Sequence, residues 1–205
     1  VEFGSNDGYL TELFNNKYNA IGIEPSPYLT NLSSEKGLKV INGYLGIDTL
    51  NEAVHENGKC KLIYGNNVFN HISELNESTE AIRASLRKDG YFVFESPYCL
   101  DVIEKYYFDT IYHEHYSYLS LTSVSKIFQK NGLVVFDVEE LRSHGGSLRY
   151  YAQRLDTGSH QISKSVRDLQ EKEGDAGMGA LYFYQDFQKK ADKIKDDLLS
   201  FLIDA

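Results

Sequence analysis

The sequence predicts an α/β protein: a mostly parallel sheet between helices, with one antiparallel strand near one edge and helices at the C-terminal end. Short apolar runs alternate with stretches of helical spacing, a pattern typical of strands buried on both faces and linked by helices. A glycine-rich turn joins the first run to the first helix. The last two runs, 133–141 and 146–154, follow each other without a helix, so one of them must run antiparallel.

The first half contains five predicted strands and three predicted helices. Ser26 and Pro27 suit the N-cap and the first position of the second helix. In the third helix, Ile82 and Leu86 mark the buried face, and Gly90 is expected at the C-terminus. The expected strands are 1–3, 19–25, 38–43, 60–65 and 91–97, and the expected helices are 9–17, 26–37 and 74–90.

The second half divides near residue 155. A helix over 122–132 and the two final strands complete a predicted core of residues 1–155. Residues 156–205 are predicted to be helical, after a polar start. Their apolar spacing fits either a helix packed on the sheet or a lead-in to a further domain; the residues are Leu181, Tyr184, Phe187, Ala191, Ile194 and Leu198.

Composition excludes several classes of protein. The 205 residues are 41% hydrophobic and 25% charged, as in an ordinary globular domain. The net charge of −9 argues against a nucleic-acid partner and an anionic membrane surface. Cys60 and Cys99 form no CxxC pair, so neither a disulfide framework nor a structural zinc site is predicted. No apolar run is long enough to span a bilayer and no signal peptide is evident, which favours the cytoplasm.

The ends of the chain lead us to expect a piece of a longer protein. The chain opens with Val1 in the middle of a predicted strand, and its one methionine is Met178. It stops soon after an amphipathic helical stretch.

The turn "VEFGSNDG" lies where a nucleotide-shaped ligand binds in such sheets. Gly4 and Gly8 bracket the turn, and Asn6 stands at the second glycine position of GxGxxG, where asparagine tolerates a positive φ. Glu24 follows Gly4 by 20 residues, the place of a carboxylate that binds ribose hydroxyls. Glu2 is expected to face the same pocket. S-adenosylmethionine and NAD are both compatible ligands, the turn favours the former, and a turn without a ligand is the alternative.

The stretch "YHEHYSYLS", residues 112–120, contains two histidines, a glutamate and three tyrosines. It suits a proton-transfer site, a metal site or a polar surface. His113 and His115 would share one face of a strand as metal ligands. No third ligand stands at metal spacing, so no metal is predicted, and His113 is expected to be structural.

The stretch "HGGSLR", residues 144–149, contains a candidate substrate contact. Its two glycines allow a close backbone approach, and Arg149, with Ser147, would suit a phosphate. A structural pairing of Arg149 is the alternative, and His144 fits either role.

Six stretches together resemble the deoxysugar C-methyltransferases that act on nucleotide-linked sugars: "VEFGSNDGYL", "GIEPS", "NNVFNHI", "FESPYCLDVIEKYYFDTIYHEHYSYLS", "FDVEEL" and "HGGSLRYY". They occur in order from residue 1 to about 154, and "DTIYHEHYSY" and "HGGSLR" are the most specific. The resemblance implies a class I, Rossmann-like fold that uses S-adenosylmethionine. It also implies a cysteine-rich zinc-binding domain before this region and another α/β domain after it.

The resemblance also implies roles for individual residues. The base corresponds to His115, with Tyr112 and Glu114 beside it and Asn67 and His71 next to the sugar. The implied cofactor contacts are Gly4, Asn6, Gly8, Glu24 and Asn66. Methylation next to a keto group requires a base that forms an enolate, and histidine suits this because its unperturbed pKa is about 6.5. Glu114 is expected to orient the ring, and a tyrosine hydroxyl or His71 to donate to the enolate oxygen.

These roles make a structural demand on residues 112–120. In a strand, Glu114 and His115 would point to opposite faces, so the segment must be irregular, in a loop after the fifth strand. Asn67 and His71 would reach the same edge from the loop after the fourth strand. The expected partner is a small nucleotide-linked sugar. The alternatives are a non-catalytic cofactor-binding module and an NAD-dependent oxidoreductase, which would need the GxGxxG that this chain lacks.

Overall fold

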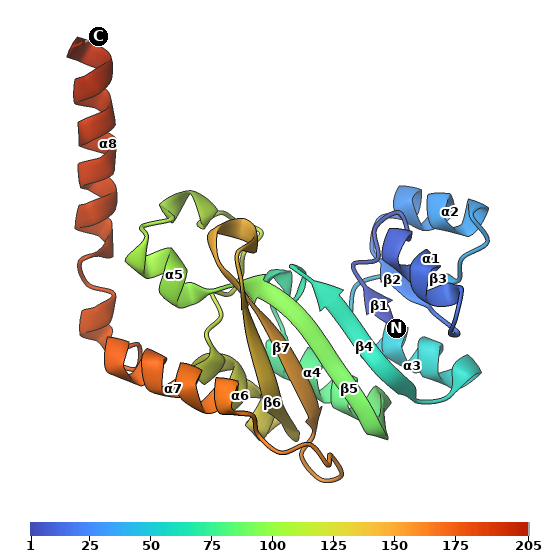
Figure 1. Ribbon diagram of the computed structural model, residues 1–205. Helices are drawn as coiled ribbons and strands as arrows, with labels where there is room; N and C mark the ends of the chain where they lie inside the picture. Colours follow the sequence, from blue (N-terminus) through green and yellow to red (C-terminus); the bar gives the residue numbers. More distant parts are fainter. Residues whose placement is uncertain (205) are drawn as a thin grey trace.

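The computed structural model describes residues 1–204, with Glu56 as backbone only, and confirms the predicted fold class (Figure 1). Within these residues one seven-stranded sheet has the order β3-β2-β1-β4-β5-β7-β6. Strands β1 to β5 pair in parallel, and β7 runs antiparallel to both β5 and β6. The strands are β1 Glu2–Phe3, β2 Gly22–Glu24, β3 Val40–Asn42, β4 Cys60–Asn66, β5 Leu86–Pro97, β6 Leu133–Leu141 and β7 Ser147–Arg154.

Helices connect the parallel strands and pack against the sheet. The helices are α1 Tyr9–Asn15, α2 Pro27–Glu35, α3 Ile47–Asn57, α4 Leu75–Ser85, α5 Cys99–Glu104, α6 Leu121–Lys130, α7 Lys164–Ala176 and α8 Phe187–Asp204. Short 3-10 turns are η1 Phe69–His71, η2 Phe108–Thr110, η3 Ser143–Gly145 and η4 Leu181–Phe183. No described helix is both long and apolar enough to cross a membrane.

An aromatic cluster forms the core between the sheet and α6. Phe92 and Phe94 alternate along β5 and so face the same side. The ring of Phe94 stacks on Tyr150 of β7, with centroids 4.5 Å apart. Phe69 of η1 lies 4.7 Å from Phe94, and Phe128 of α6 lies 5.7 Å from Phe92. The core thus holds η1, and the residues that follow it, against the end of β5.

The start of α2 follows the predicted capping pattern. The side chain of Ser26 accepts a hydrogen bond from the backbone N–H of Leu29, 3.4 Å away, and Pro27 is the first helical residue. Local sequence alone therefore specifies where this helix begins.

The third predicted helix is too long. α4 ends at Ser85, and Leu86–Gly90 belong to β5, so the expected helix C-terminus at Gly90 is wrong. Leu86 is buried and pairs with Cys60 of β4. A Cβ at Gly90 would stand 2.8 Å from the carbonyl oxygen of Cys60. Sheet pairing overrides the helical pattern here.

Two helices, α3 and α5, were absent from the prediction. α3 buries Leu50 and Ala53 at i, i+3 spacing, a signal that its many polar residues obscure. α5 has six residues, too few for a clear period.

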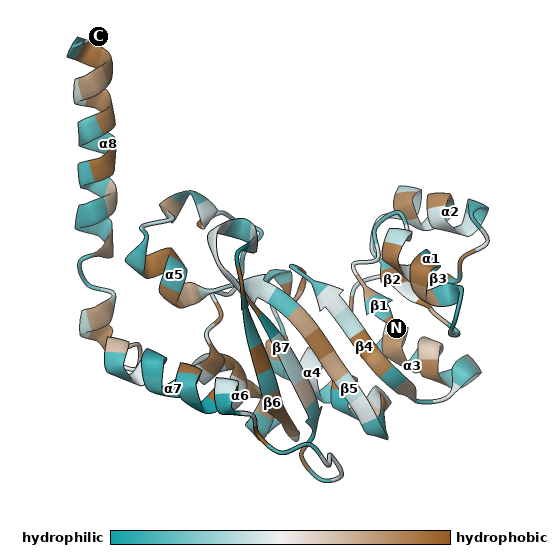
Figure 2. Cartoon of the chain, in the orientation of Figure 1, coloured by the Kyte–Doolittle hydropathy of each residue, from teal (hydrophilic) through white to brown (hydrophobic). Residues whose placement is uncertain are grey.

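The two C-terminal helices behave differently. α7 packs on β6 and α6 and buries Val166 and Leu169, so the interpretation of a helix packed on the sheet is right for α7. α8 extends away from the sheet (Figure 1) and has no buried residue. Hydrophobic and hydrophilic residues alternate along it (Figure 2). The division of the chain at residue 155 stays a prediction.

Candidate active site

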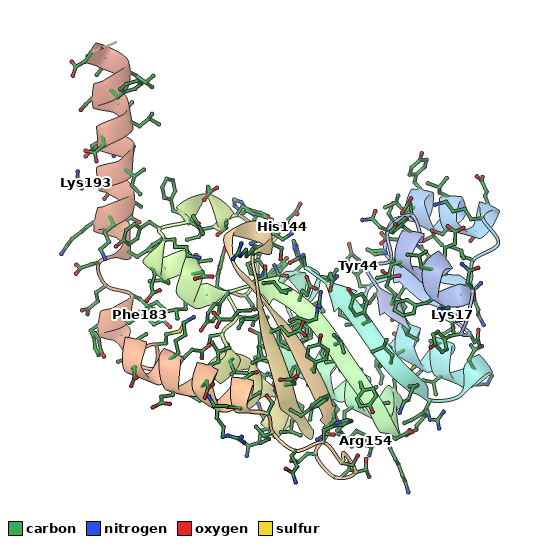
Figure 3. All side chains as sticks on the ribbon, viewed as in Figure 1. Lys17, Tyr44, His144, Arg154, Phe183 and Lys193 are labelled. Atoms are coloured by element: carbon green, nitrogen blue, oxygen red, sulfur yellow. The ribbon has the colours of Figure 1, made fainter. Side chains whose placement is uncertain are left out.

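The site is built at the edge of the sheet where the parallel strands end. Figure 3 labels His144 at this edge, where β6 turns into β7, and Arg154 at the opposite edge, where β7 ends. Among the described non-glycine residues, four have a left-handed backbone: Asn6, Asn67, Tyr106 and His144, with φ of 56°, 53°, 58° and 52°. They follow β1, β4, α5 and β6 respectively. Backbone strain therefore gathers at the edge where such sheets bind ligands.

The glycine-rich turn after β1 has the predicted conformation. Gly4, Asn6 and Gly8 have φ of 62°, 56° and 80°, which confirms that Asn6 adopts a positive φ at the second glycine position. A Cβ on Gly4 would stand 2.5 Å from Cγ2 of Val68. The loop after β4 thus approaches the turn so closely that position 4 favours glycine.

Glu24 joins this turn to the next helix. Its carboxylate accepts hydrogen bonds from the backbone N–H of Asn6 at 3.0 Å and of Ser26 at 2.9 Å, and Glu24 is only 6% exposed. A carboxylate has about four lone-pair sites, so two remain for ligand hydroxyls. The end of β2 therefore holds a fixed acceptor that fits a ribose.

Glu2 contacts the helix that follows its strand. Its carboxylate accepts a hydrogen bond from the hydroxyl of Thr11 in α1, 2.5 Å away. It lines a 520 Å³ cavity shared with residues at the amino-terminal ends of β2 and β4, such as Ile21 and Cys60. Burial raises the pKa of Glu2. The side chain of Glu2 turns toward α1, and its expected place in the cofactor pocket stays a prediction.

The loop after β4 presents three asparagines. Asn66 is exposed at the end of the strand. The backbone N–H of Asn67 donates to the carbonyl oxygen of Glu95, 2.9 Å away. In the described part of the chain, Oδ1 of Asn67 and both amide atoms of Asn70 are buried without a hydrogen-bond partner. Buried amide atoms usually have a hydrogen-bond partner, so these atoms are available to a water molecule or a ligand at this loop.

His115 has a defined tautomer. Its Nδ1 lies 2.9 Å from the carbonyl oxygen of Thr110, and its Nε2 lies 2.8 Å from the hydroxyl of Tyr112. A carbonyl oxygen can only accept, so Nδ1 carries the proton and donates it to Thr110. In the neutral ring, Nε2 then carries no proton, and its lone pair accepts a hydrogen bond from the hydroxyl of Tyr112. The atom available as a base is therefore Nε2.

The second histidine of the site packs against the first. The rings of His71 and His115 meet edge to face, with centroids 4.9 Å apart. Burial, and then the neighbouring His115, lower the pKa of His71, while Glu114 acts in the opposite direction. The backbone N–H of Ser117 donates to the carbonyl oxygen of Asn70, 3.2 Å away. The loops after β4 and α5 therefore meet at one place, as predicted.

Residues 111–118 form an irregular loop, as the prediction required. Glu114 and His113 are both exposed. The ring of His115 is oriented by the carbonyl of Thr110 and not by Glu114, so the role expected for Glu114 as the orienting group is wrong. The exposed His113 does not fill a structural position in the core.

Ser147 and Arg149 are engaged within the protein. Ser147 is 1% exposed, and its hydroxyl donates to the carbonyl oxygen of Ser143, 3.0 Å away. Nε of Arg149 donates to Glu95 at 2.7 Å, and Nη1 donates to Glu139 at 3.0 Å. Glu95, Arg149 and Glu139 are register partners across β5, β7 and β6. Of the two interpretations of Arg149, these contacts favour the structural pairing.

Metal ligands are not assembled at this edge. Across residues 1–204, no three His, Cys, Asp or Glu side chains gather in a group that could hold a metal ion. The Nδ1 and Nε2 atoms of His115 are both used in hydrogen bonds. The expectation of a metal-free site stays a prediction.

Two parts of the site were missed by the sequence analysis. The carbonyl of Thr110 orients His115, and a backbone group leaves no trace in residue identity. The ring of Tyr118 lies 6.0 Å from that of His115; its place in the "YHEHYSY" stretch was the available signal.

Comparisons with known proteins agree with this architecture. The family model of a methyltransferase domain matches residues 1–138, and that of a C-methyltransferase C-terminal domain matches residues 142–205. C-methyltransferase NovU of Streptomyces niveus is 31% identical over 196 residues, which are 95% of this chain and 46% of that protein. The chain thus spans less than half the length of this relative.

Solved structures share the fold at low identity. A putative methyltransferase in complex with the Haloferax volcanii Trm112 activator aligns with a TM-score of 0.60 and 14% identity, over 75% of this chain and 81% of that one. An S-adenosylmethionine-dependent methyltransferase of Clostridium acetobutylicum aligns with a TM-score of 0.58 and 15% identity, over 75% of this chain and 82% of that one.

The strand order, the glycine-rich turn with its following acid, and the two family models lead to the same assignment. This chain belongs to the family of S-adenosylmethionine-dependent C-methyltransferases.

Proposed function

We propose that the complete protein transfers a methyl group from S-adenosylmethionine to a carbon next to a keto group of a nucleotide-linked deoxysugar, with His115 as the base. The observation that carries the proposal is the hydrogen bonding of His115, which leaves Nε2 as the basic atom at the edge of the sheet. Family membership supports the C-methyl transfer, and the motifs around "DTIYHEHYSY" and "HGGSLR" support the sugar class.

Residues of the β1 and β2 ends would hold the cofactor. Glu24 would accept hydrogen bonds from the ribose with the lone pairs that Asn6 and Ser26 leave free. The left-handed turn over Gly4, Asn6 and Gly8 leaves backbone close to the ligand. When bound, the cofactor supplies an electrophilic methyl group on a sulfonium.

His115 would make the substrate carbon nucleophilic. Carbon becomes a nucleophile when the proton next to the keto group is removed, and Nε2 of His115 is the lone pair available to take it. The imidazolium that forms would keep its Nδ1–H bond to the carbonyl of Thr110. That bond strengthens as the ring gains charge. Tyr112 must give up its bond to Nε2 when the substrate arrives, which frees its hydroxyl.

Neighbouring groups would stabilise the enolate oxygen. The hydroxyl of Tyr112 lies 2.8 Å from the basic atom, and the ring of His71 packs edge to face against the ring of His115. Either can donate a hydrogen bond to the oxygen on which negative charge develops. Burial lowers the pKa of His71, so the neutral ring would be the form that acts here. Asn67, on the same loop, is the third candidate for a contact with the sugar.

Calorimetry and an exchange assay test the proposal together. The complete protein should bind S-adenosylmethionine and show no comparable heat with NAD. Added to a nucleotide-linked keto-deoxysugar in heavy water without a methyl donor, it should exchange the acidic C–H. Cofactor binding without exchange or methylation of any such sugar would favour a non-catalytic cofactor-binding module. Binding of NAD alone would exclude the methyltransferase assignment.

A further inference from the structure

The core contains a carboxylate that the proposed chemistry does not use. Glu173 of α7 is 1% exposed. Its Oε1 accepts from the backbone N–H of Leu121 at 2.7 Å, and its Oε2 accepts from that of Thr122 at 2.8 Å. The adjacent cation, Lys172, pairs with Glu140 instead. The partner of this buried charge is therefore the N-terminus of helix α6.

Burying a carboxylate is unfavourable unless its charge is compensated. The first two N–H groups of a ten-residue helix provide that compensation through hydrogen bonds and the helix dipole. The next N–H, of Ser123, is capped by the hydroxyl of Ser120 at 3.2 Å. α7 and the cap together specify the start of α6. Burial, and then the charge of Glu173, raise the pKa of Tyr98 and of Tyr150.

The start of α6 is also the end of the segment that holds His115. The chain leaves the sheet after Tyr98, and the N–H of Cys99 donates to the carbonyl oxygen of Leu119, 3.0 Å away. Residues 99–119 are thus an excursion whose two ends meet in a narrow neck. After the neck come the N-cap Ser120 and then Leu121 and Thr122, the first two residues of α6. Glu173 accepts hydrogen bonds from the backbone N–H groups of these two residues.

The other side of the neck is braced as well. The N–H of Tyr98 donates to the carbonyl oxygen of Gly146 in the β6–β7 turn, 3.0 Å away. Gly146 has a φ of 136°, a backbone conformation that favours glycine, and its Cα faces the side chain of Asp101. The turn thus holds one side of the neck, and the bonds of Glu173 hold the helix start on the returning side.

We propose that Glu173 is a positioning residue for His115: by clamping the neck of the 99–119 excursion, α7 holds the loop in which Nδ1 of His115 meets the carbonyl of Thr110. The inference rests on the proposed function for the role of His115. It makes α7, which lies beyond the match to the methyltransferase-domain model, a part of the active-site structure.

The test compares Glu173→Gln with Glu171→Gln in the complete protein. Glutamine keeps one carbonyl oxygen but presents an NH₂ to the second N–H, so one of the two bonds is lost. Glu171 is exposed on the same helix, and its variant should behave as wild type. Nitrogen-15 NMR of labelled histidine, without cofactor or substrate, reports the tautomer of His115, and hydrogen exchange reports the loop.

We expect Glu173→Gln to convert the single Nδ1–H tautomer of His115 into a mixture. The amides of residues 112–122 should exchange about tenfold faster, while those of β4 and β5 stay unchanged. Turnover should fall by about 10- to 100-fold through misplacement of the base, with the KM for the cofactor within about twofold of wild type. A helix-docking role alone would not change the tautomer.

An unchanged tautomer and unchanged loop exchange in Glu173→Gln would overturn the inference, whatever the activity. A loosened loop with full turnover, in a protein where His115→Gln is inactive, would also overturn it. If His115→Gln keeps full activity, the proposed function fails separately, and the tautomer measurement still decides the clamp. Should Glu173→Gln not fold, Ser120→Ala weakens the same helix start without touching α7. The inference then requires a smaller shift toward a mixed His115 tautomer and a smaller increase in loop exchange in Ser120→Ala.

Discussion

Nε2 of His115 lies 2.8 Å from the hydroxyl oxygen of Tyr112, while Nδ1 of the same ring lies 2.9 Å from the carbonyl oxygen of Thr110. The second contact fixes the proton on Nδ1, and the first therefore places a phenol on the lone pair of the proposed base. A basic nitrogen with a hydroxyl donor beside it suits proton removal from carbon, because the nitrogen can take the proton and the hydroxyl can stabilise the oxyanion that forms.

His115→Gln should remove the base and leave the cofactor site intact. We expect turnover to fall by about 10²–10⁴, the usual contribution of a positioned general base, with nearly unchanged affinity for S-adenosylmethionine. Exchange of the sugar's acidic C–H with heavy water, assayed without a methyl donor, should stop as well. If exchange and methylation both survive, the base lies elsewhere, and His71 becomes the candidate.

Tyr112→Phe should have a smaller effect than His115→Gln. It deletes one hydrogen-bond donor and keeps the ring that packs on His115, 4.1 Å between centroids. A net contribution of about 0.5–1.5 kcal/mol per hydrogen bond corresponds to a loss of about 2- to 13-fold in kcat. Tyr116→Phe is the matched control, since Tyr116 is 66% exposed in the same loop. Equal effects of the two variants would argue against a role for the Tyr112 hydroxyl.

Glu24→Ala should weaken cofactor binding by about 1.5–3 kcal/mol, the range for hydrogen bonds to a charged group. Part of this loss will come from the turn, because Glu24 also accepts from the N–H of Asn6. Glu35→Ala, an exposed change on the adjacent helix, controls for altered charge. Calorimetry with S-adenosylmethionine measures both, and an unchanged affinity in Glu24→Ala would place the ribose elsewhere.

His71 should make stability depend on pH. Burial and His115 lower its pKa in the folded protein, so between this lowered value and the unfolded value of about 6.5 the unfolded state binds more protons. Stability should therefore be complete above about pH 6.5 and decrease as the pH falls through this window. Urea unfolding of wild type and His71→Gln at several pH values isolates the contribution, and a wild-type curve that declines no more steeply than the variant's would contradict it.

Arg149→Ala should reduce stability and not substrate affinity. The change leaves Glu95, which is 6% exposed, without its cation, and we expect a loss of about 2–4 kcal/mol in the free energy of unfolding. Arg87→Ala, which breaks an exposed pair with Asp89, should change it by less than about 1 kcal/mol. A large rise in the KM for the nucleotide sugar with little loss of stability would restore Arg149 as a substrate contact.

The fold and the outline of the site could be predicted from the sequence because local patterns specify them. Buried runs, the Ser26–Pro27 helix start and the glycine-rich turn depend on neighbours within a few residues. The irregular loop over residues 111–118 followed from one stereochemical argument, that Glu114 and His115 cannot face one side of a strand.

Tertiary structure alone decided what each side chain contacts. Glu2 turns to Thr11, Arg149 pairs with Glu95, and a backbone carbonyl instead of Glu114 orients His115. The end of α4 was set by pairing of Leu86 with β4. Such contacts join residues far apart in the chain or involve backbone atoms, and burial energy selects among several locally acceptable partners. Residue identity determines what chemistry is available, and packing determines which atoms meet.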